Sequence, residues 1–249
     1  KLRCGGRTIS EYDENLPKDL SVEDILVHSS NIGSVKIGQI IGQEKLQKFL
    51  KKIGILSQLE FDIEEIGKPL FFRWRDCKLK TVSYGHGITT TPIQLAKGYA
   101  ILTNGGYDVK PTLVKEKFPS LKKKRILNKD VSNQMNKILR KVVTHGTASL
   151  SDVEGYEVGG KTGTAQIVEN GVYTNKKINT FASVFPSSNP KYVLVILLED
   201  TKLSKDYVYK YRNKPGHYKG TPFNTAGWTS VEVTGKIIDK IGPILATKY

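Results

Sequence analysis

The stretch "GGKTGTAQ" (159–166) places a lysine and two threonines around a glycine, just before an apolar run. In an extended strand Thr162 and Thr164 point to one face, because side chains alternate with a period of two. Gly163 has no side chain, so a ligand backbone can approach the strand closely there. With the charge of Lys161 beside the two hydroxyls, this element suits a peptide that ends in a carboxylate and binds as an added strand. Taken alone, the stretch more often marks an ordinary strand entry with a solvated lysine.

A second polar element, "HSSNIG" (28–33), lies between two predicted helices. Ser29 and Asn31 are alternate residues of a short turn, so both side chains can face one cleft. A hydroxyl passes a proton, and a carboxamide can hydrogen-bond both ends of a peptide amide. The alternative is helix capping, because serine and asparagine are common N-caps that contribute about 1 kcal/mol. Taken alone, this turn favours capping.

Five segments show the hydrophobic spacing of helices. Ser21 and Thr91 are predicted N-caps, and Pro92 occupies the first helical position after Thr91. One long helix is predicted over 31–54, with Gly54 as its stop. The helical segments are 21–29, 31–54, 91–106, 130–146 and 230–242.

Strands follow one another in the C-terminal half of the chain. Apolar runs at 156–168, 178–186 and 191–200 are separated by turn residues. Short connections such as "SSNP" favour antiparallel neighbours. Helices, then strands, then a closing helix predict a single α/β domain in which helices pack against an antiparallel sheet.

Composition limits the class of protein only loosely. The 249 residues suffice for one large domain or two small ones, and no apolar run approaches the roughly 20 residues of a membrane helix. The net charge of +15 fits nucleic acid, an anionic membrane or an acidic polymer. Most basic residues are scattered lysines, however, which favours general surface charge. Cys4 and Cys77 fit no metal spacing, and either a disulfide or two free thiols are compatible with the sequence.

Together and in this order, the two polar elements resemble those of the penicillin-binding transpeptidases, which combine a Ser-x-x-Lys, a Ser-Asp-Asn type and a Lys-Thr-Gly element. "SSN" (29–31) and "KTGT" (161–164) match the second and third. The segments 84–106, 180–200 and 224–245 are also similar to the family, so the resemblance spans essentially the whole chain. It is strongest to the monofunctional class B enzymes. Lys-Thr-Gly in place of Lys-Ser-Gly favours the septal member, which serves cell division.

The resemblance implies a penicillin-binding, serine β-lactamase-like α/β fold and serine acyl transfer with no cofactor. In such enzymes a serine attacks the bond between two terminal D-alanines of a peptidoglycan stem peptide. An amine of a neighbouring stem then resolves the acyl-enzyme, which forms a cross-link. Carried over to this chain, Ser29 relays protons and Asn31 holds the substrate amide. Lys161 tunes the electrostatics of the site and supports proton transfer.

The same resemblance makes Thr162, Gly163 and Thr164 the substrate-binding edge. The two threonines would bind the terminal carboxylate, and the backbone of Thr164 would supply an oxyanion-hole N–H. β-Lactam antibiotics would acylate the enzyme in the same cleft.

The Ser-x-x-Lys element has no match before Ser29, where the family requires it. Ser120 and Ser188 do have a lysine three residues later, but both lie on the wrong side of Ser29 and are interpreted as chance matches. We therefore expect residues 1–249 to be the C-terminal part of a transpeptidase domain that is inactive alone, with its nucleophile and membrane anchor outside the sequence. A naturally inactive relative that binds or regulates is the alternative.

The resemblance also implies partners and a location. We expect peptidoglycan stem peptides, β-lactams and membrane proteins of the division complex as partners, and a periplasmic domain held at the inner membrane. No metal site is expected, because the four histidines are far apart in the sequence. Alternating tyrosines and basic residues at 205–220 superficially suit single-stranded nucleic acid. The family places a loop there, so we expect no nucleic-acid partner.

Overall fold

The computed structural model describes residues 2–64, 66–70, 74, 76–115, 124–170, 172–202, 204–209, 216–219 and 224–248. The chain divides into two compact units, Lys1–Met135 and Asn136–Tyr249, each with buried hydrophobic side chains of its own. Ser120 lies outside the described residues, as does part of the tyrosine-rich stretch 205–220.

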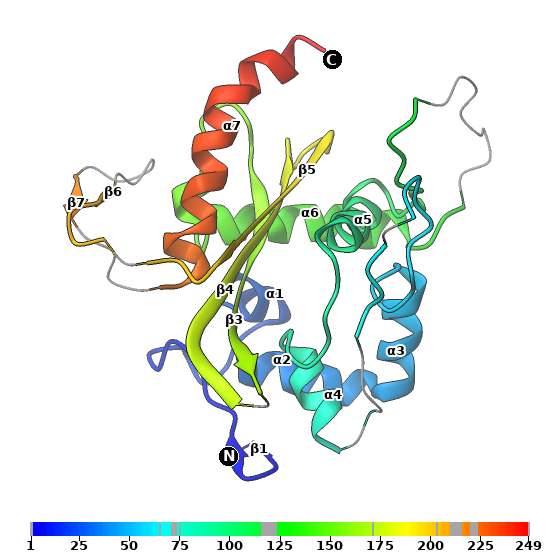
Figure 1. The fold of residues 1–249 in the computed structure, drawn as a ribbon, viewed down its shortest axis with the longest axis vertical. Helices are drawn as coiled ribbons and strands as arrows, with labels where there is room; N and C mark the ends of the chain where they lie inside the picture. The colour runs from blue at the N-terminus through cyan, green and yellow to red at the C-terminus, as the bar shows by residue number, and fades with distance from the viewer. Residues whose placement is uncertain are drawn as a thin grey trace. The chain divides into compact units, whose positions relative to one another are not determined.

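Helices dominate the first unit (Figure 1). A small hairpin of β1 (Arg3–Cys4) and β2 (Arg7–Thr8) precedes α1 (Val22–Val27), α2 (Asn31–Ile41), α3 (Gln43–Lys52), α4 (Asp76–Ser83) and α5 (Pro92–Thr103). Helices α1, α3 and α4 all contact α2. A hydrophobic cluster forms where the end of α3 meets α5, and its buried members are Ile53, Ile55, Leu56, Ile101 and Ile126.

The predicted single helix over 31–54 is wrong, because the chain forms two helices there. Gly42 separates α2 from α3 and has a φ of +82°, a left-handed conformation that glycine adopts without a steric cost. Its N–H still donates to Gly38 O at 2.9 Å and closes α2.

The predicted N-caps are confirmed. Ser21 Oγ accepts a hydrogen bond from Asp24 N at 3.0 Å at the start of α1. Thr91 forms a reciprocal capping box with Gln94 at the start of α5, and Pro92 lies in the first turn. Both helix starts follow from local sequence, since a cap satisfies N–H groups that have no partner within the helix.

The second unit contains a three-stranded antiparallel sheet in the order β3-β4-β5. These strands, β3 (Gly159–Glu169), β4 (Val172–Phe185) and β5 (Tyr192–Glu199), confirm the predicted antiparallel arrangement. Helix α7 (Ser230–Ala246) packs along β4 and β5 (Figure 1). The remaining elements are α6 (Lys129–Thr144), β6 (Val208–Tyr209), β7 (Tyr218–Lys219) and two 3-10 turns, η1 (Ser149–Ser151) and η2 (Ala226–Trp228).

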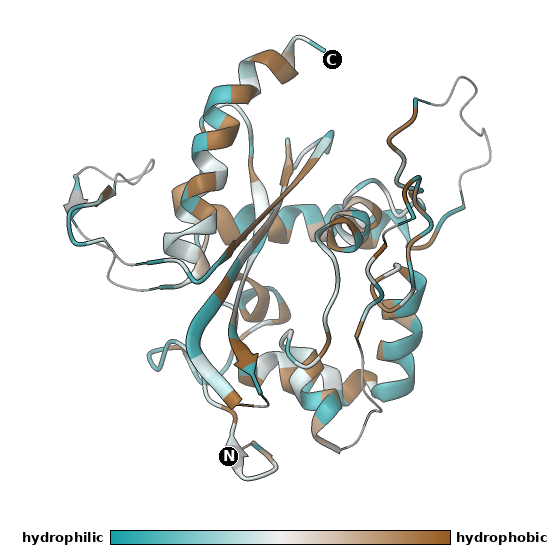
Figure 2. Ribbon diagram, in the orientation of Figure 1, coloured by the Kyte–Doolittle hydropathy of each residue, from teal (hydrophilic) through white to brown (hydrophobic). Residues whose placement is uncertain are grey.

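Buried side chains of the second unit lie on both faces of the central strand β4, and α7 packs along β4 and β5. The first half of β4 is largely exposed and becomes hydrophilic after its first residues, whereas the second half is mostly buried and more hydrophobic (Figure 2). Phe181 and Val184 of β4 are fully buried, as are Val231 and Ile238 of α7. Burial of each such side chain contributes about 1.5–3 kcal/mol. This packing holds β4 in place, and β4 in turn positions β3 through their shared ladder of hydrogen bonds.

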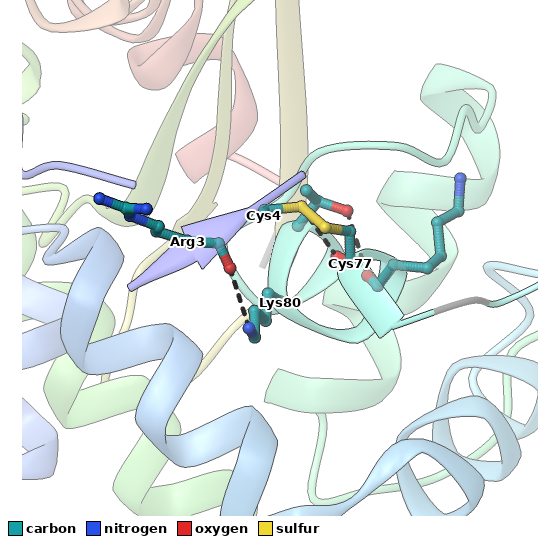
Figure 3. The surroundings of a disulfide bond; sticks show 6 residues. Arg3, Cys4, Cys77 and Lys80 are labelled. Carbon is teal, nitrogen blue, oxygen red and sulfur yellow. Dashed lines mark hydrogen bonds between the residues drawn. A yellow bond between two sulfur atoms is a disulfide. The ribbon is translucent and has the colours of Figure 1, made fainter. Parts of the chain in front are cut away.

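Cys4 and Cys77 form a disulfide, which decides between the two alternatives that the sequence leaves open (Figure 3). The bond joins the β1–β2 hairpin to α4 within the first unit. Lys80 Nζ donates to Arg3 O at 2.9 Å and links the same two elements a second time. The first residues of the chain are thereby attached to the helices.

Candidate active site

The turn 29–31 connects α1 to α2 in the first unit. Ser29 has a φ of +59°, so the chain reverses sharply at this residue. Ser30 is the N-cap of α2, and its nearly buried Oγ accepts a hydrogen bond from Gly33 N at 2.9 Å. The capping interpretation is therefore correct for the middle serine, and Ser29 and Asn31 remain the candidates for chemistry.

The carboxylate of Glu11 holds this turn. Its Oε1 accepts hydrogen bonds from Ser30 Oγ at 2.6 Å and from Ile32 N at 3.2 Å. Its Oε2 accepts a third from Asn31 N at 2.7 Å. A negative charge at the first turn of α2 also interacts favourably with the helix dipole. Sequence reasoning missed Glu11, because this residue lies 19 positions before Ser30 and nothing in the local pattern marks it.

The side chain of Asn31 is also fixed by the N-terminal segment. Its Nδ2 donates to Ser10 O at 2.9 Å, while its backbone N–H donates to Glu11. The segment 10–11 therefore orients the amide that the sequence assigns to substrate binding. A group held in this way loses little further freedom when a ligand binds.

The stretch 161–164 lies in β3, at one edge of the described sheet. Within that sheet β3 pairs only with β4, so its other side offers backbone N–H and C=O groups to an added strand. The register places Thr162 opposite Phe181 and Thr164 opposite Asn179. The two threonines therefore share one face of the sheet, as their spacing predicts.

Lys161 adds a tunable positive charge to this edge. Its Nζ donates to Thr162 O at 3.2 Å and lies 3.5 Å from Thr162 Oγ1. Burial lowers the pKa of Lys161 to about 8, because the charged ammonium loses part of its hydration. An amine with this pKa carries a positive charge at neutral pH and can also release and take up a proton near that pH.

Both threonine hydroxyls have a partner within the second unit. Thr162 Oγ1 lies 2.8 Å from Thr147 Oγ1, and Thr164 Oγ1 accepts a hydrogen bond from Ala226 N at 3.0 Å. Sequence reasoning named neither Thr147 nor Ala226 as a site residue. The segment of Ala226 resembles the family, but only the folded chain shows which atoms of the two residues contact the threonines.

A polar network supports the segment that reaches Thr164. Asn179 Nδ2 donates to Thr201 Oγ1 at 3.0 Å and to Asn224 Oδ1 at 2.6 Å. Asn224 Nδ2 donates in turn to Thr201 O at 2.9 Å. Because Asn179 is fully buried, these hydrogen bonds are strongly preferred over leaving its amide nitrogen unpaired. The network therefore fixes Asn224, two residues before the Ala226 N–H that donates to Thr164.

Two glycines of β3, Gly160 and Gly163, differ in how much room a side chain would have. A Cβ on Gly160 would lie 2.5 Å from the ring of Phe181, so packing requires glycine there. Gly163 is exposed, and among the described residues a Cβ on it would meet only Thr180 O, at 3.9 Å. Packing among the described residues therefore gives no reason for glycine at position 163.

The structure brings the predicted residues together in two groups. Ser29 and Asn31 share one turn of the first unit, and Lys161, Thr162 and Thr164 share one edge of the second. That the two groups form one site stays a prediction. In the part of the chain that the structure describes, no three His, Cys, Asp or Glu residues cluster as metal ligands would. The helices described there are all too short or too polar to cross a bilayer.

Comparisons with known proteins agree with the resemblance seen in the sequence. The profile of the family described as "Penicillin binding protein transpeptidase domain" matches residues 3–219, which reach into both units. The probable peptidoglycan D,D-transpeptidase FtsI of Caulobacter vibrioides is 29% identical over 99% of the chain and 41% of its own length. Stage V sporulation protein D of Bacillus subtilis is 31% identical over 81% of the chain and 32% of its own length.

A solved structure supports the fold independently. Penicillin-binding protein 3 of Mycobacterium tuberculosis, in complex with ampicillin, matches with a TM-score of 0.78 and 22% identity. The match covers 97% of this chain and 55% of that structure. The predicted α/β fold of the penicillin-binding transpeptidases is therefore confirmed.

The chain belongs to the penicillin-binding protein transpeptidase family, and its similarity is to the FtsI-like members of class B. It spans about 41% of the first of these curated relatives and 32% of the second.

Proposed function

We propose that the protein is a peptidoglycan D,D-transpeptidase that cross-links stem peptides by serine acyl transfer and binds β-lactams. The observation behind the proposal is the edge of β3, where Thr162 and Thr164 present two hydroxyls on one face beside Lys161. This edge suits an extended peptide with a terminal carboxylate. Two relatives support the proposal, one named a probable peptidoglycan D,D-transpeptidase and one solved with ampicillin.

Each group has a role in this chemistry. The hydroxyls of Thr162 and Thr164 donate hydrogen bonds to the terminal carboxylate, and the charge of Lys161 attracts it. The backbone N–H of Thr164 stabilises the oxyanion that forms when the serine attacks. Gly163 lets the backbone of the substrate approach the strand.

The turn 29–31 supplies the remaining groups. Asn31 binds the amide of the substrate, and Ser29 passes the proton between the nucleophile and the leaving amine. Glu11 holds Asn31 in position through its contact with the backbone.

We propose that the nucleophilic serine and its lysine partner lie outside the 249 residues. Of the two chance matches to Ser-x-x-Lys, Ser188 lies in the turn between β4 and β5, and its Oγ donates to the Glu157 carboxylate. In the family the nucleophilic serine begins a helix, whereas Ser188 lies in an exposed turn between two strands. The chain alone is then inactive.

The same proposal assigns a place in the cell. The Cys4–Cys77 disulfide favours an oxidising compartment such as the periplasm, because thiols in the cytosol are kept reduced. A periplasmic transpeptidase needs a membrane anchor, which we place outside this sequence. We infer a septal role, with division proteins of the membrane as partners, from Lys-Thr-Gly at 161–163 and from the relative named FtsI.

The test uses the full-length protein that contains this sequence. Incubation with a stem peptide ending in D-alanyl-D-alanine and an amino acceptor should release D-alanine and join the acceptor to the shortened stem. Replacing Thr162 and Thr164 by valine should raise the KM for the peptide by about one to two orders of magnitude, since two hydrogen bonds to a charged group are lost. Thr247→Val, at the exposed end of α7, is the matched control. Unchanged KM in the double variant would contradict the proposed role of β3.

A further inference from the structure

Thr147 is an exposed residue that contacts the proposed carboxylate site. Its Oγ1 lies 2.8 Å from Thr162 Oγ1, although 15 residues separate the two in sequence. Thr147 follows α6 and precedes η1, in a connection that contains no other residue of the proposed site.

The backbone around Thr147 is held on both sides. His145 N donates to Lys141 O at 2.8 Å, and Ala148 N donates to Val142 O at 3.1 Å. On the other side, a Cβ on Gly227 would approach Thr147 O to 2.8 Å, so η2 lies directly against this carbonyl. The hydroxyl of Thr147 therefore starts from a fixed main chain.

The direction of the hydrogen bonds matters for a bound anion. A threonine hydroxyl has one hydrogen to donate and two lone pairs to accept with. A carboxylate can only accept, so Thr162 must give its hydrogen to a bound carboxylate. Thr147 must then donate its own hydrogen to Thr162. At Thr164 the direction is already fixed. The backbone N–H of Ala226 can only donate, so Thr164 Oγ1 accepts from it and can give its own hydrogen to the ligand.

We propose that Thr147 is a positioning residue that directs the hydroxyl hydrogen of Thr162 toward the substrate carboxylate. This inference rests on the proposed function, because it names how that same edge acquires its preference for a carboxylate. Thr147 contacts Thr162 and acts through it. Together, Thr147 and Ala226 leave the hydrogens of Thr162 and Thr164 free for one ligand group.

The experiment measures acylation of the full-length protein by a labelled penicillin and by the methyl ester of the same compound, which lacks the carboxylate. Thr147→Val should lower the second-order acylation rate for the free acid about tenfold, which corresponds to the loss of one hydrogen bond. The ester should lose less than about twofold, because it offers no carboxylate to Thr162. Thr147→Ser keeps the hydroxyl and should behave like the parent.

Controls separate this role from a general effect on folding. Thr144→Val removes a neighbouring hydroxyl that donates to Arg140 O at 3.3 Å, lies 2.7 Å from His145 Nδ1 and has no contact with Thr162 in the part of the chain that the structure describes, and it should leave both rates unchanged. Rates for Thr147→Val that match the parent, or that fall equally for acid and ester, overturn the inference while the proposed function stands. A parent protein that neither probe acylates overturns the proposed function, and the inference with it.

Discussion

Glu11 Oε1 lies 2.6 Å from Ser30 Oγ, across 19 residues of sequence, and the same carboxylate accepts the backbone N–H of Asn31. Ser30 is the N-cap of α2, so one acidic side chain from the N-terminal segment holds both the cap and the first residue of the helix. The two candidate residues of this turn, Ser29 and Asn31, lie on either side of Ser30, which Glu11 contacts through its side chain. Their positions therefore depend on Glu11.

Replacing Glu11 by glutamine should destabilise the first unit and weaken the turn. The variant keeps the size of the side chain but loses the charge and one acceptor, which we expect to cost about 1–2 kcal/mol. Chemical denaturation of the purified chain measures this cost. Glu14→Gln is the matched control, because Glu14 is exposed in the same segment and should change stability by less than about 0.5 kcal/mol. Equal stability of the two variants would show that the contact with Ser30 contributes nothing.

Alanine at the two glycines of β3 should give opposite results. Gly160→Ala places a methyl group against Phe181 and should destabilise the second unit by about 1–3 kcal/mol. Gly163→Ala has room within the described protein and should leave stability nearly unchanged, but should reduce acylation of the full-length protein by penicillin at least tenfold. Thermal unfolding and labelling are measured on both variants. Normal labelling of Gly163→Ala would rule out close approach of the ligand at this residue.

Lys161 should make stability depend on pH in the alkaline range. Its pKa falls from 10.5 in the unfolded chain to about 8 in the folded protein, so the cost of burying its charge is fully present below pH 8. Between pH 8 and 10.5 the unfolded chain holds more protons, so this contribution should raise stability with pH, by up to about 3 kcal/mol. Lys161→Met should lack this rise, and should be the more stable protein at pH 7. Urea unfolding of both proteins between pH 7 and 10.5 checks the sign, and identical pH profiles would contradict it.

The Cys4–Cys77 disulfide should stabilise the first unit. It joins residues 73 positions apart, and closing a loop of this length in the unfolded chain is worth at most about 4 kcal/mol. A reducing agent should therefore lower the denaturation midpoint of the parent and leave that of a Cys4→Ser, Cys77→Ser double variant unchanged. Thiol titration of the unfolded, unreduced parent should find no free thiol. Two free thiols in protein isolated from its natural compartment would remove the support for an oxidising location.

Sequence reasoning succeeds where a local signal determines the outcome. The caps at Ser21 and Thr91 were predictable because the capping residue and the N–H groups that it satisfies lie within one helical turn. The alternation of Thr162 and Thr164 follows from the strand period alone. The order of the strands also follows from short connections between them.

The sequence did not reveal contacts that the fold creates over long distances. The helical periodicity of the sequence continues through Gly42 without interruption. Only the positive φ of Gly42 in the structure shows where α2 ends. Glu11 and Thr147 lack any motif, because each acts through a partner on another element. Whether Cys4 and Cys77 form a disulfide or stay free thiols was equally open from the sequence, and the structure shows the hairpin and α4 joined by the bond. These residues support the candidate site, and tertiary structure is needed to find them.

The central claim is that this chain supplies the Lys-Thr-Gly edge of a penicillin-binding transpeptidase whose nucleophile lies elsewhere in the protein. Peptide mapping by mass spectrometry after incubation with penicillin tests this claim most directly, with the full-length protein and residues 1–249 treated in parallel. We predict one acylated serine in the full-length protein, located before residue 1 of this sequence and followed three residues later by lysine, and no adduct on the chain alone. An adduct on any serine within these 249 residues, or no adduct on the full-length protein, would contradict the account.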